Sequence, residues 1–529
     1  MTGKLSLRTA DADSSRLTGE HADRIPLNTE GLSLRNPVVL IAAMGLLAFV
    51  VRAFTWFQPE SLLAEREYDD GVMFAASIAT LKGMAPYADF VYLHPPGSIL
   101  LLTPFAALAG PVTDTQALAV ARGAFALIGV ANTVLVGVLL RRAGRLAILV
   151  GAGTYAVWSN AVRAEETVLL EPILNLLLLI ALVCLARRKR ALVFVAGALL
   201  GFALTVKYWA VVDILIVGAI IAIVWGWRGV WRYLVGGTAT VLIVMLPPFL
   251  RAPGDMWAQT VTAQLTRPRS VSGAGPSVWG RHVSPIAGQH ILDFLVPGLV
   301  WAALFVLLVL AVTVALLWGP ARAWGHPSRW PASAWWAILL LAHFGLLLVT
   351  GKAFYYHYAS WIIAPLALCL GALTIAVRRL RARRVAAVVA GAAILVVGAG
   401  NLIRPAVPIG SPTELAAASA SYDCVWGTPS QLIVADRLSS GLANDCAIDI
   451  DPFGVALADF AEGAGRTDAP QWNPLWLDHA WQQITAADAV ILQPGMGDAF
   501  FTPTQMTEFE SRFELVYEDD RATVWARSG

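Results

Sequence analysis

The run VWAALFVLLVLAVTVALLW, residues 300–318, contains no charged side chain. About 20 apolar residues are enough to cross the hydrocarbon core of a bilayer, so this run predicts a transmembrane helix. A second run, VVLIAAMGLLAFVV (38–51), has the same character. Of all 529 residues, 57% are hydrophobic and only 14% are charged, whereas an average soluble chain carries about 25% charged residues. The sequence therefore predicts a polytopic α-helical membrane protein.

The apolar runs predict about eleven membrane spans. They lie near 36–57, 116–140, 146–160, 167–186, 191–206, 209–226, 233–250, 291–318, 333–350, 359–377 and 385–402. The shorter run at 96–110 is expected to lie in the membrane interface. Residues 1–35 are polar and basic, and we expect a disordered cytoplasmic tail followed by an uncleaved first helix.

The distribution of Lys and Arg predicts the orientation in the membrane. These residues cluster in RRAGR (141–145), ARRKR (186–190), WRGVWR (227–232) and RRLRARR (378–384). Cytoplasmic loops are enriched in Lys and Arg, and every cluster falls on the cytoplasmic side if the N-terminus is inside. We therefore expect a multi-pass plasma-membrane protein. Its transmembrane domain (36–402) has its first outer loop at 58–115, and its C-terminal residues 403–529 are extracytoplasmic.

The C-terminal residues differ in composition from the rest, with ordinary polarity and short strand-like runs. The runs are QLIVAD (431–436), DAVILQ (488–493) and FELVYEDDRATVWA (513–526), the last read as a hairpin that turns at Asp519 and Asp520. We expect a small extracytoplasmic α/β domain over 403–529. Two cysteines in an exported domain, Cys424 and Cys446, indicate a disulfide; two unpaired buried thiols are the alternative.

Several function classes lack support in the sequence. It contains no Walker A motif, no G-x-G-x-x-G after a strand, no H-E-x-x-H and no C-x-x-C. Nucleotide-driven transport and a thiolate metal site are therefore not indicated. No platform of basic and aromatic residues outside the membrane suggests nucleic-acid binding.

One polar stretch stands out, EYDDGVMFAASIATLKGMAPYADFVYLHPP (67–96). Asp69 and Asp70 begin a predicted amphipathic helix at the interface, where the helix dipole favours ionised carboxylates. An ionised carboxylate at the membrane surface is a competent general base if it reaches a hydroxyl proton, and we assign both residues as catalytic. A carboxylate pair can also hold a divalent cation, so metal dependence stays open. The alternative is an ordinary solvated pair.

Three cations on the predicted outer face complement the carboxylates. They are Lys207 at the end of one span, Arg163 in a short outer loop and Lys352 at the end of another span. Each by itself is consistent with a side chain that snorkels to the interface. Together they suit a lipid-linked phosphate, because cations stabilise a departing phosphate. We therefore predict that they bind the donor phosphate.

The remaining polar and aromatic residues of the outer face are assigned to a substrate pocket. His94, which precedes two prolines, can bond a carboxylate or a phosphate, although the prolines by themselves explain a rigid turn. Tyr356 and His357 suit the wall of a lipid or sugar site, or else an interfacial aromatic belt. The pocket assignment is completed by Asp89 and Tyr92.

These motifs, in this order, resemble the GT-C superfamily of membrane glycosyltransferases. The branch is that of protein O-mannosyltransferases and lipid A aminoarabinose transferases. The matching elements are Asp69-Asp70, Gly83…Tyr87, His94-Pro95-Pro96, Arg122, the segment ending at Lys207, and Tyr356-His357-Tyr358…Pro365. The sequence departs from the family pattern in having Asp70 for Glu, Gly97 for Leu, and no Lys between His94 and Pro95.

The resemblance implies a polyprenyl-phosphate sugar as donor and Asp69 as the base that deprotonates an acceptor hydroxyl. Attack on the anomeric carbon then inverts it. The acceptor would be an envelope glycan, lipid or protein, and no nucleotide cofactor is required. Two other classes stay open: a secondary transporter or lipid flippase, which would place charges at the membrane midplane, and a non-catalytic scaffold that uses the outer domain to bind envelope partners.

Overall fold

The computed structural model describes residues 36–267, 298–322, 327–349, 355–403, 410–461, 474–494 and 501–529. The predicted cytoplasmic tail at 1–35 lies outside the described residues. Residues Pro37–Gly529 form one compact unit. The predicted separation of 403–529 as a domain therefore remains a prediction, because this segment packs into the same unit as the helices before it.

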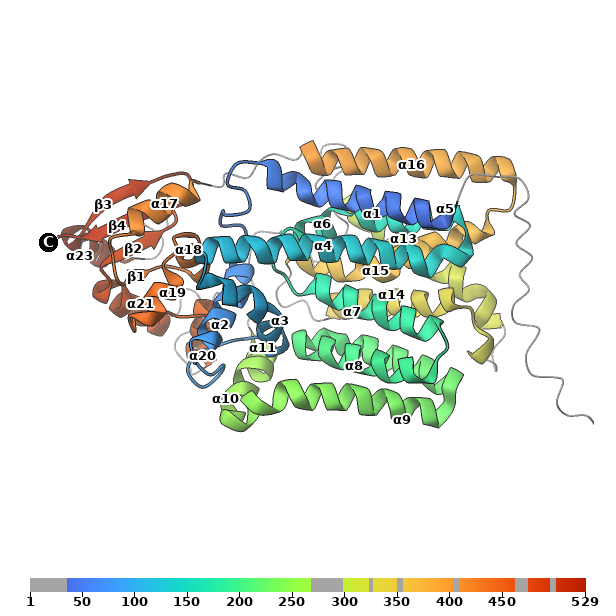
Figure 1. Cartoon of the computed structure of the whole chain (residues 1–529), viewed down its shortest axis with the longest axis horizontal. Helices are drawn as coiled ribbons and strands as arrows, with labels where there is room; N and C mark the ends of the chain where they lie inside the picture. Colours follow the sequence, from blue (N-terminus) through green and yellow to red (C-terminus); the bar gives the residue numbers. More distant parts are fainter. Residues whose placement is uncertain are drawn as a thin grey trace, which may run out of the picture. The chain divides into compact units, whose positions relative to one another are not determined.

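Apolar helices fill the larger part of this unit (Figure 1). They are α1 (Pro37–Ala53), α4 (Asp114–Leu140), α5 (Arg145–Val157), α7 (Glu171–Ala186), α8 (Arg190–Val206), α9 (Val211–Arg251), α13 (Gly298–Arg322), α14 (Ala332–Val349), α15 (Ile363–Leu373) and α16 (Leu380–Ile403). By length and composition, six helical stretches among the described residues can cross a membrane. Shorter apolar helices, α5, α7 and α8 among them, occupy other predicted positions. The chain is thus a multi-pass helical membrane protein, and the total of about eleven spans stays a prediction.

Helix α9 contains a sharp reversal at Gly226. Gly226 has φ 63° and ψ −166°, which no helical residue adopts. The Tyr233 hydroxyl donates to the carbonyl of Ile214 at 3.1 Å. In a straight helix these residues would be about 28 Å apart at 1.5 Å per residue, so the two halves of α9 fold back on each other.

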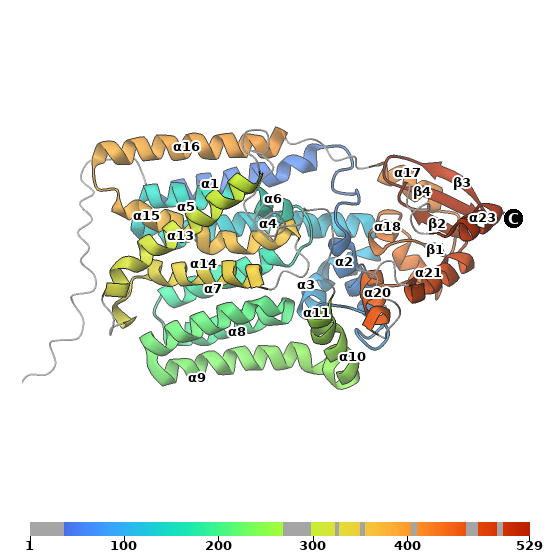
Figure 2. The same ribbon diagram turned by 180° about the vertical axis from the view of Figure 1, so that it is seen from behind.

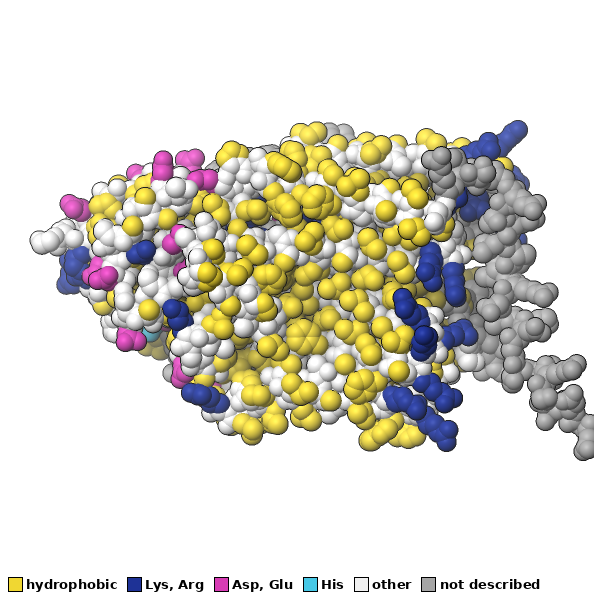
Figure 3. All heavy atoms as spheres, viewed as in Figure 1, with side chains coloured by type: hydrophobic (Ala, Val, Ile, Leu, Met, Phe, Trp, Pro, Cys, Tyr) yellow, Lys and Arg dark blue, Asp and Glu magenta, His cyan; other side chains and the backbone are white. Residues whose placement is uncertain are grey.

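The four basic clusters lie at one end of the helices. The α4–α5, α7–α8 and α15–α16 connections and the turn of α9 share that end, and the sheet lies beyond the other end (Figures 1 and 2). The space-filling view shows Lys and Arg side chains gathered there, next to a broad apolar surface (Figure 3). A polar surface at the end of an apolar belt is expected where helices leave the bilayer.

Short helices lie in the connections between the apolar helices. They are α2 (Tyr68–Leu81), α3 (Gly97–Ala106), α6 (Ser159–Glu165), α10 (Pro253–Trp257), α11 (Ala263–Thr266), the π-helical turn η5 (Ala258–Thr262) and the 3-10 helix η8 (Tyr356–Ile362). Helix α2 was predicted to be amphipathic and interfacial. The predicted amphipathic character is wrong, because every residue from Asp70 to Ala79 is buried, whereas the interfacial location stays a prediction.

The C-terminal part is a four-stranded sheet with helices around it. The strands are β1 (Val425–Trp426), β2 (Ala489–Leu492), β3 (Phe513–Glu518) and β4 (Thr523–Arg527), in the order β1-β2-β4-β3. The first pair is parallel and the other two are antiparallel. The helices are α17 (Pro412–Ser419), α18 (Pro429–Val434), α19 (Leu438–Ala443), α20 (Pro452–Ala461), α21 (Pro474–Ala486) and α23 (Pro503–Arg512). The hairpin at 513–526 is confirmed, with Asp519 accepting hydrogen bonds from Arg521 and Ala522 in the turn.

The predicted strand QLIVAD is wrong, because residues Pro429–Val434 form helix α18. Thr428 and Gln431 form a capping box, in which each side chain binds the backbone N–H of the other residue. Pro429 occupies the first helical turn, where its missing N–H costs nothing. These local signals outweigh the apolar run, which fits a buried helix as well as a strand.

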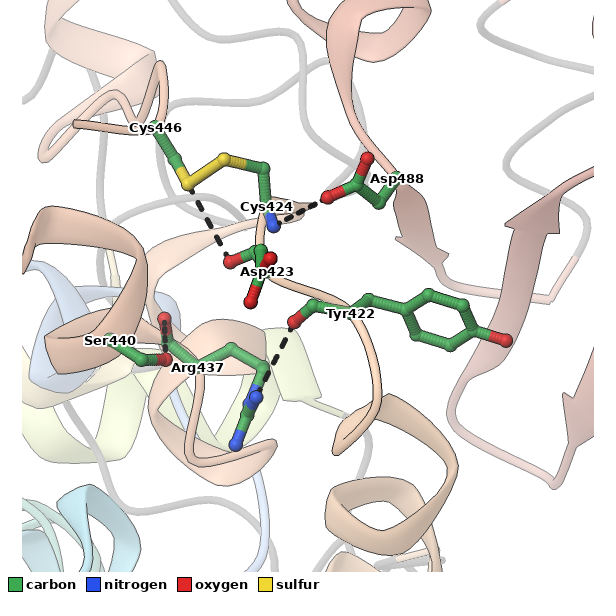
Figure 4. Close-up of a disulfide and its surroundings, with 7 residues drawn as sticks. All are labelled: Tyr422, Asp423, Cys424, Arg437, Ser440, Cys446 and Asp488. Atoms are coloured by element: carbon green, nitrogen blue, oxygen red, sulfur yellow. Dashed lines mark hydrogen bonds between the residues drawn. A yellow bond between two sulfur atoms is a disulfide. The ribbon is translucent and has the colours of Figure 1, made fainter. Parts of the chain in front are cut away.

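Cys424 and Cys446 form a disulfide beside strand β1 (Figure 4). The backbone N–H of Cys424 donates to Asp488 at 2.9 Å, and the Arg437 guanidinium donates to the carbonyl of Tyr422. These bonds hold the chain that leads into β1 against β2 and α19. Cys184 and Cys369 are free thiols in apolar helices.

Candidate active site

The two adjacent carboxylates at the start of α2 have different environments. Both lie in the first turn, where the helix dipole stabilises negative charge. Asp70 is completely buried and accepts from Nε and Nη2 of Arg122 at 3.0 and 2.7 Å. Arg122 also donates to the carbonyls of Leu62 and Ala64. Asp70 therefore fits a structural role, in contrast to the predicted catalytic one.

Asp69 faces the other way and is accessible. Its side chain is 32% exposed, and its Oδ2 lies 3.7 Å from Nε2 of His357. The His357 ring is stacked on Tyr355, with centroids 5.6 Å apart and planes within 2°. Nδ1 of His357 has no hydrogen-bond partner among the described residues. Asp69 is thus a carboxylate with a positioned imidazole on one side and an open approach on the other.

Lys207 follows the last residue of α8 and points into a cage of rings and a carboxylate. Its Nζ lies 2.5 Å from Oε1 of Glu171, 4.0 Å from the Trp209 ring centroid and 4.3 Å from that of Tyr358. Oε2 of the buried Glu171 has no hydrogen-bond partner in the described part of the chain. An ammonium has three donors, so Lys207 retains the capacity to bind an anion.

His94 connects these groups electrostatically. Burial lowers the pKa of His94 to about 4; the charge of Asp69 acts in the opposite direction, and that of Lys207 in the same direction. Glu171 and Arg267 also act on this imidazole. His94 is therefore neutral near pH 7. The ring of His94 packs edge-on against Tyr92 at 5.6 Å.

Arg163 lies on the α2 side of this site. Its guanidinium is 5.5 Å from the Tyr356 ring centroid, and the Tyr356 hydroxyl donates to Oε1 of Glu67 at 2.6 Å. Burial raises the pKa of Glu67 to about 7; the bond from Tyr356 opposes the shift, and the charges of Asp70 and Asp69 add to it. Arg163 also acts on this carboxylate, because its charge lowers the pKa of Glu67.

Arg267, at the end of α11, contributes a further cation that the sequence did not predict. It donates to the Tyr355 hydroxyl at 3.0 Å, and its guanidinium lies 4.6 Å from the ring centroid of Phe453. Tyr355 is the residue on which His357 stacks. No motif marks Arg267, because it stands in a polar loop and acquires its neighbours only through folding.

The C-terminal part reaches this site directly. The carboxylate of Asp451 accepts from the backbone N–H of Leu93 at 3.2 Å and of Gly454 at 2.9 Å. The backbone N–H of Phe453 donates to the Tyr68 hydroxyl at 2.9 Å. Burial raises the pKa of Asp451 to about 6. The segment that begins α20 thus joins the residues flanking both Asp69 and His94.

Comparisons with known proteins point to glycosyltransferases. The model of Glycosyltransferase family 87 matches residues 92–351, just under half of the chain, and these include His94, Lys207 and Arg267. The structure of ArnT from Cupriavidus metallidurans in the apo state is similar, with TM-score 0.52, 16% identity, and 92% of this chain and 97% of that chain covered. The chain therefore shares the fold of ArnT. An apo oligosaccharyltransferase from Archaeoglobus fulgidus has a similar fold to this chain, with TM-score 0.54, 12% identity, and coverage of 93% and 74%. No curated protein matches it by sequence.

Two predicted pocket residues, Asp89 and Tyr92, make polar contacts within the first outer loop. Asp89 is exposed and accepts from the backbone N–H of Ala85 at 2.7 Å. Tyr92 is buried, with its hydroxyl 2.6 Å from that of Ser98. Both side chains thus serve as polar partners where the outer loop folds on itself, and their assignment to the pocket stays a prediction. Lys352 lies outside the described residues.

The Gly83…Tyr87 element shapes the same loop. Both residues have positive φ, 96° for Gly83 and 70° for Tyr87, a region that side chains disfavour. The Tyr87 hydroxyl donates to the carbonyl of His94 at 2.7 Å. The strained turn thereby fixes the backbone that presents His94. Among the described residues, no group of three or more His, Cys, Asp or Glu side chains is placed to hold a metal ion.

Proposed function

We propose that this chain is a membrane glycosyltransferase that moves a sugar from a polyprenyl-phosphate donor to a hydroxyl of a cell-envelope glycan, lipid or protein, with inversion at the anomeric carbon. The observation that carries the proposal is the accessible carboxylate of Asp69 beside His357, in a site that also holds Lys207 and Arg267. A lipid-linked donor is supported by the related fold of the archaeal oligosaccharyltransferase AglB from Archaeoglobus fulgidus, which has been seen in complex with a dolichol-phosphate (TM-score 0.53, 11% identity, coverage of 93% and 74%).

The proposed reaction needs one base and a stabilised leaving group. Asp69 takes the proton of the acceptor hydroxyl as its oxygen attacks the anomeric carbon. The bond from that carbon to the phosphate oxygen breaks, its electron pair goes to the phosphate, and polyprenyl phosphate leaves. Lys207 and Arg267 are placed to offset the charge that develops on the phosphate. His357 keeps the Asp69 carboxylate oriented.

The proposed site faces the extracytoplasmic side. The four basic clusters lie at the end of the helices remote from the sheet and from the C-terminal end of α8, which Lys207 follows (Figure 1). Since cytoplasmic ends are enriched in Lys and Arg, this distribution supports an extracytoplasmic location for the site and for residues 403–529. The Cys424–Cys446 disulfide supports this side, because disulfides persist in oxidising compartments.

The test supplies radiolabelled polyprenyl-phosphate sugars and envelope acceptors to the purified full chain and identifies the product. Asp69→Asn should lower the transfer rate about 10²- to 10⁴-fold, the usual contribution of a general base, with the melting temperature unchanged. Asp89→Asn is the matched control on the same outer loop and should transfer at the wild-type rate. Transfer by Asp69→Asn at the wild-type rate would disprove the assignment of Asp69 as the base.

A transporter or lipid flippase is the second candidate, favoured by one buried pair within the helices. Nε2 of His343 in α14 lies 2.6 Å from Oδ1 of Asp213 in α9, and both side chains are at most 1% exposed. Buried ionisable groups at membrane depth are often functional. Proteoliposomes containing the chain decide between the two: lipid flipping or solute uptake without any glycosyl product would favour this candidate over the glycosyl transfer.

A further inference from the structure

A basic pocket lies between the start of α8 and the turn of α9, at the end of the helices opposite the candidate active site. Arg190, Arg228 and Arg232 line it together with Val193, Trp225 and Gly229, and its volume is ≈60 Å³. Lys207 lies at the other end of α8, about 25 Å away at 1.5 Å per residue. The pocket is thus distinct from the site around Asp69.

The three arginines of the pocket are not neutralised by the protein. None of them forms an ion pair with a carboxylate within the described part of the chain. The one acidic residue in the whole segment 172–254 is Asp213, which is buried against His343. Three guanidinium groups at one pocket with no counter-charge form an anion site, and guanidinium geometry suits phosphate oxygens.

The backbone at the turn of α9 shapes the pocket. The break at Gly226 brings Arg228 and Arg232 beside the start of α8. A Cβ on Gly229 would lie 2.4 Å from Cβ of Trp225, so the absence of a side chain at 229 allows the indole to fold across the turn. A site needs roughly 10–15 Å³ to hold one water, and this pocket has room for a phosphate group.

The surroundings of the pocket are those of a membrane surface. Trp227 and Trp231, in the same turn, are 73% and 60% exposed. Exposed tryptophans mark the headgroup region of a bilayer. Phe194 on α8 and Leu234 on α9 are 43% and 42% exposed, so apolar surface continues from the pocket along both helices. A ligand with an anionic head and acyl chains matches both parts.

We propose that this pocket binds the phosphate of an anionic phospholipid in the leaflet opposite the candidate active site. The three arginines contact the headgroup, the tryptophans lie at headgroup depth, and the acyl chains run along α8 and α9. This binding tethers the reversal of α9 to the bilayer surface. The proposal does not depend on the glycosyl transfer, because it concerns the other end of the helices.

Native mass spectrometry of the full chain tests the proposal. The purified protein in neutral detergent is titrated with phosphatidylglycerol, with phosphatidylcholine and with inorganic phosphate. Arg228→Gln/Arg232→Gln should bind phosphatidylglycerol about 30-fold more weakly, at about 1 kcal/mol for each surface arginine. Arg381→Gln/Arg384→Gln removes the same charge from the same end of the helices, away from the pocket, and should bind as the wild type does.

The outcomes are distinct. The four substituted arginines, Arg228, Arg232, Arg381 and Arg384, are exposed. Both double variants should therefore keep the wild-type melting temperature in phosphatidylcholine. A lower melting temperature in both variants would show that the substitutions destabilise the fold. If the two double variants lost the same affinity for phosphatidylglycerol, the proposed binding site in the pocket would be overturned. The lipid would then be attracted to the basic loops in general. If the wild type bound phosphatidylcholine as tightly as phosphatidylglycerol, the assignment to an anionic lipid would be overturned. Binding of inorganic phosphate as tight as that of phosphatidylglycerol would overturn it too.

Discussion

Asp69 and Asp70 are neighbours in sequence but belong to different parts of the molecule. Successive residues of a helix point about 100° apart, so only one of the two can face the site. Asp70 points into the protein and pairs with Arg122, whereas Asp69 points towards His357. The different environments of the two carboxylates therefore follow from helix geometry.

Removal of the Asp70 carboxylate tests its structural role. Asp70→Ala leaves the guanidinium of Arg122 buried with only carbonyl partners. Breaking a buried ion pair in this way typically costs about 3–5 kcal/mol, so the melting temperature should fall sharply. Asp69→Ala should change the free energy of unfolding by less than about 0.5 kcal/mol. Equal stability of the two variants would contradict the assigned roles.

Glu67 predicts a pH dependence of stability. Its pKa is raised to about 7 from 4.5, mainly by burial, so folding favours the protonated form. The resulting stabilisation is complete below pH 4.5 and is lost as the pH rises through 7. Glu67→Gln removes this dependence. The melting temperature of the wild type minus that of Glu67→Gln should therefore decrease between pH 4.5 and 8. The melting temperature of the wild type minus that of Asp89→Asn should stay constant over the same range. A constant difference for Glu67→Gln would disprove the shifted pKa.

At the scale of elements, α2 is held between the membrane helices and the C-terminal part. Helix α18 packs on it, and the Ser430 hydroxyl donates to the carbonyls of Glu67 and Tyr68. This contact explains why α2 is buried on all sides although its apolar pattern suggested an interfacial helix. Gly71 lies at the closest approach, where a Cβ would be 2.6 Å from Cα of Ser430.

Gly71→Ala tests the contact between α2 and α18. The added methyl group meets backbone atoms that have no rotamer to change, and overpacking of this kind costs about 1–3 kcal/mol. We expect a lower melting temperature and slower transfer, because α2 carries Asp69. Gly110→Ala is the control, since no heavy atom lies within 4 Å of the position that its added methyl group would take. Indistinguishable melting curves for the two variants would rule out the close approach.

At the scale of the whole molecule, segments far apart in sequence complete one site. Asp69, Lys207, Arg267 and Phe453 come from four regions of the chain, and Phe453 belongs to the segment that was predicted to be a separate domain. Asp451 and Phe453 form hydrogen bonds with Leu93 and Tyr68, near the two ends of the stretch 67–96. The C-terminal part therefore positions the site, which a detached scaffold would not do.

Phe453→Ala tests this positioning. The ring of Phe453 holds the Arg267 guanidinium at 4.6 Å, and such a contact is worth about 0.5–2 kcal/mol. If Arg267 binds the donor phosphate, kcat/KM for the donor should fall about 3- to 30-fold. Leu515→Ala, on the exposed face of β3 with its side chain 44% exposed, should leave kcat/KM unchanged. If Phe453→Ala left kcat/KM for the donor unchanged, the C-terminal part would have no role in positioning Arg267 for catalysis.

Local patterns accounted for much of the fold. The apolar runs, the basic clusters and the hairpin at 513–526 are properties of short segments, and the structure has helices, basic connections and strands at those places. The strand predicted at QLIVAD failed although the helix signal at Thr428, Pro429 and Gln431 was present in the sequence. The apolar run was given more weight than the capping residues.

The sequence by itself determined a multi-pass helical membrane protein and drew attention to Asp69, His94, Lys207 and His357, because these features depend on composition and short motifs. Only the tertiary structure decided that Asp70 pairs with Arg122, that α2 is buried, and that Arg267 and Phe453 complete the site. The physical reason is range: an ion pair or a ring contact forms between residues that folding brings together, and a sequence window records neither partner's position.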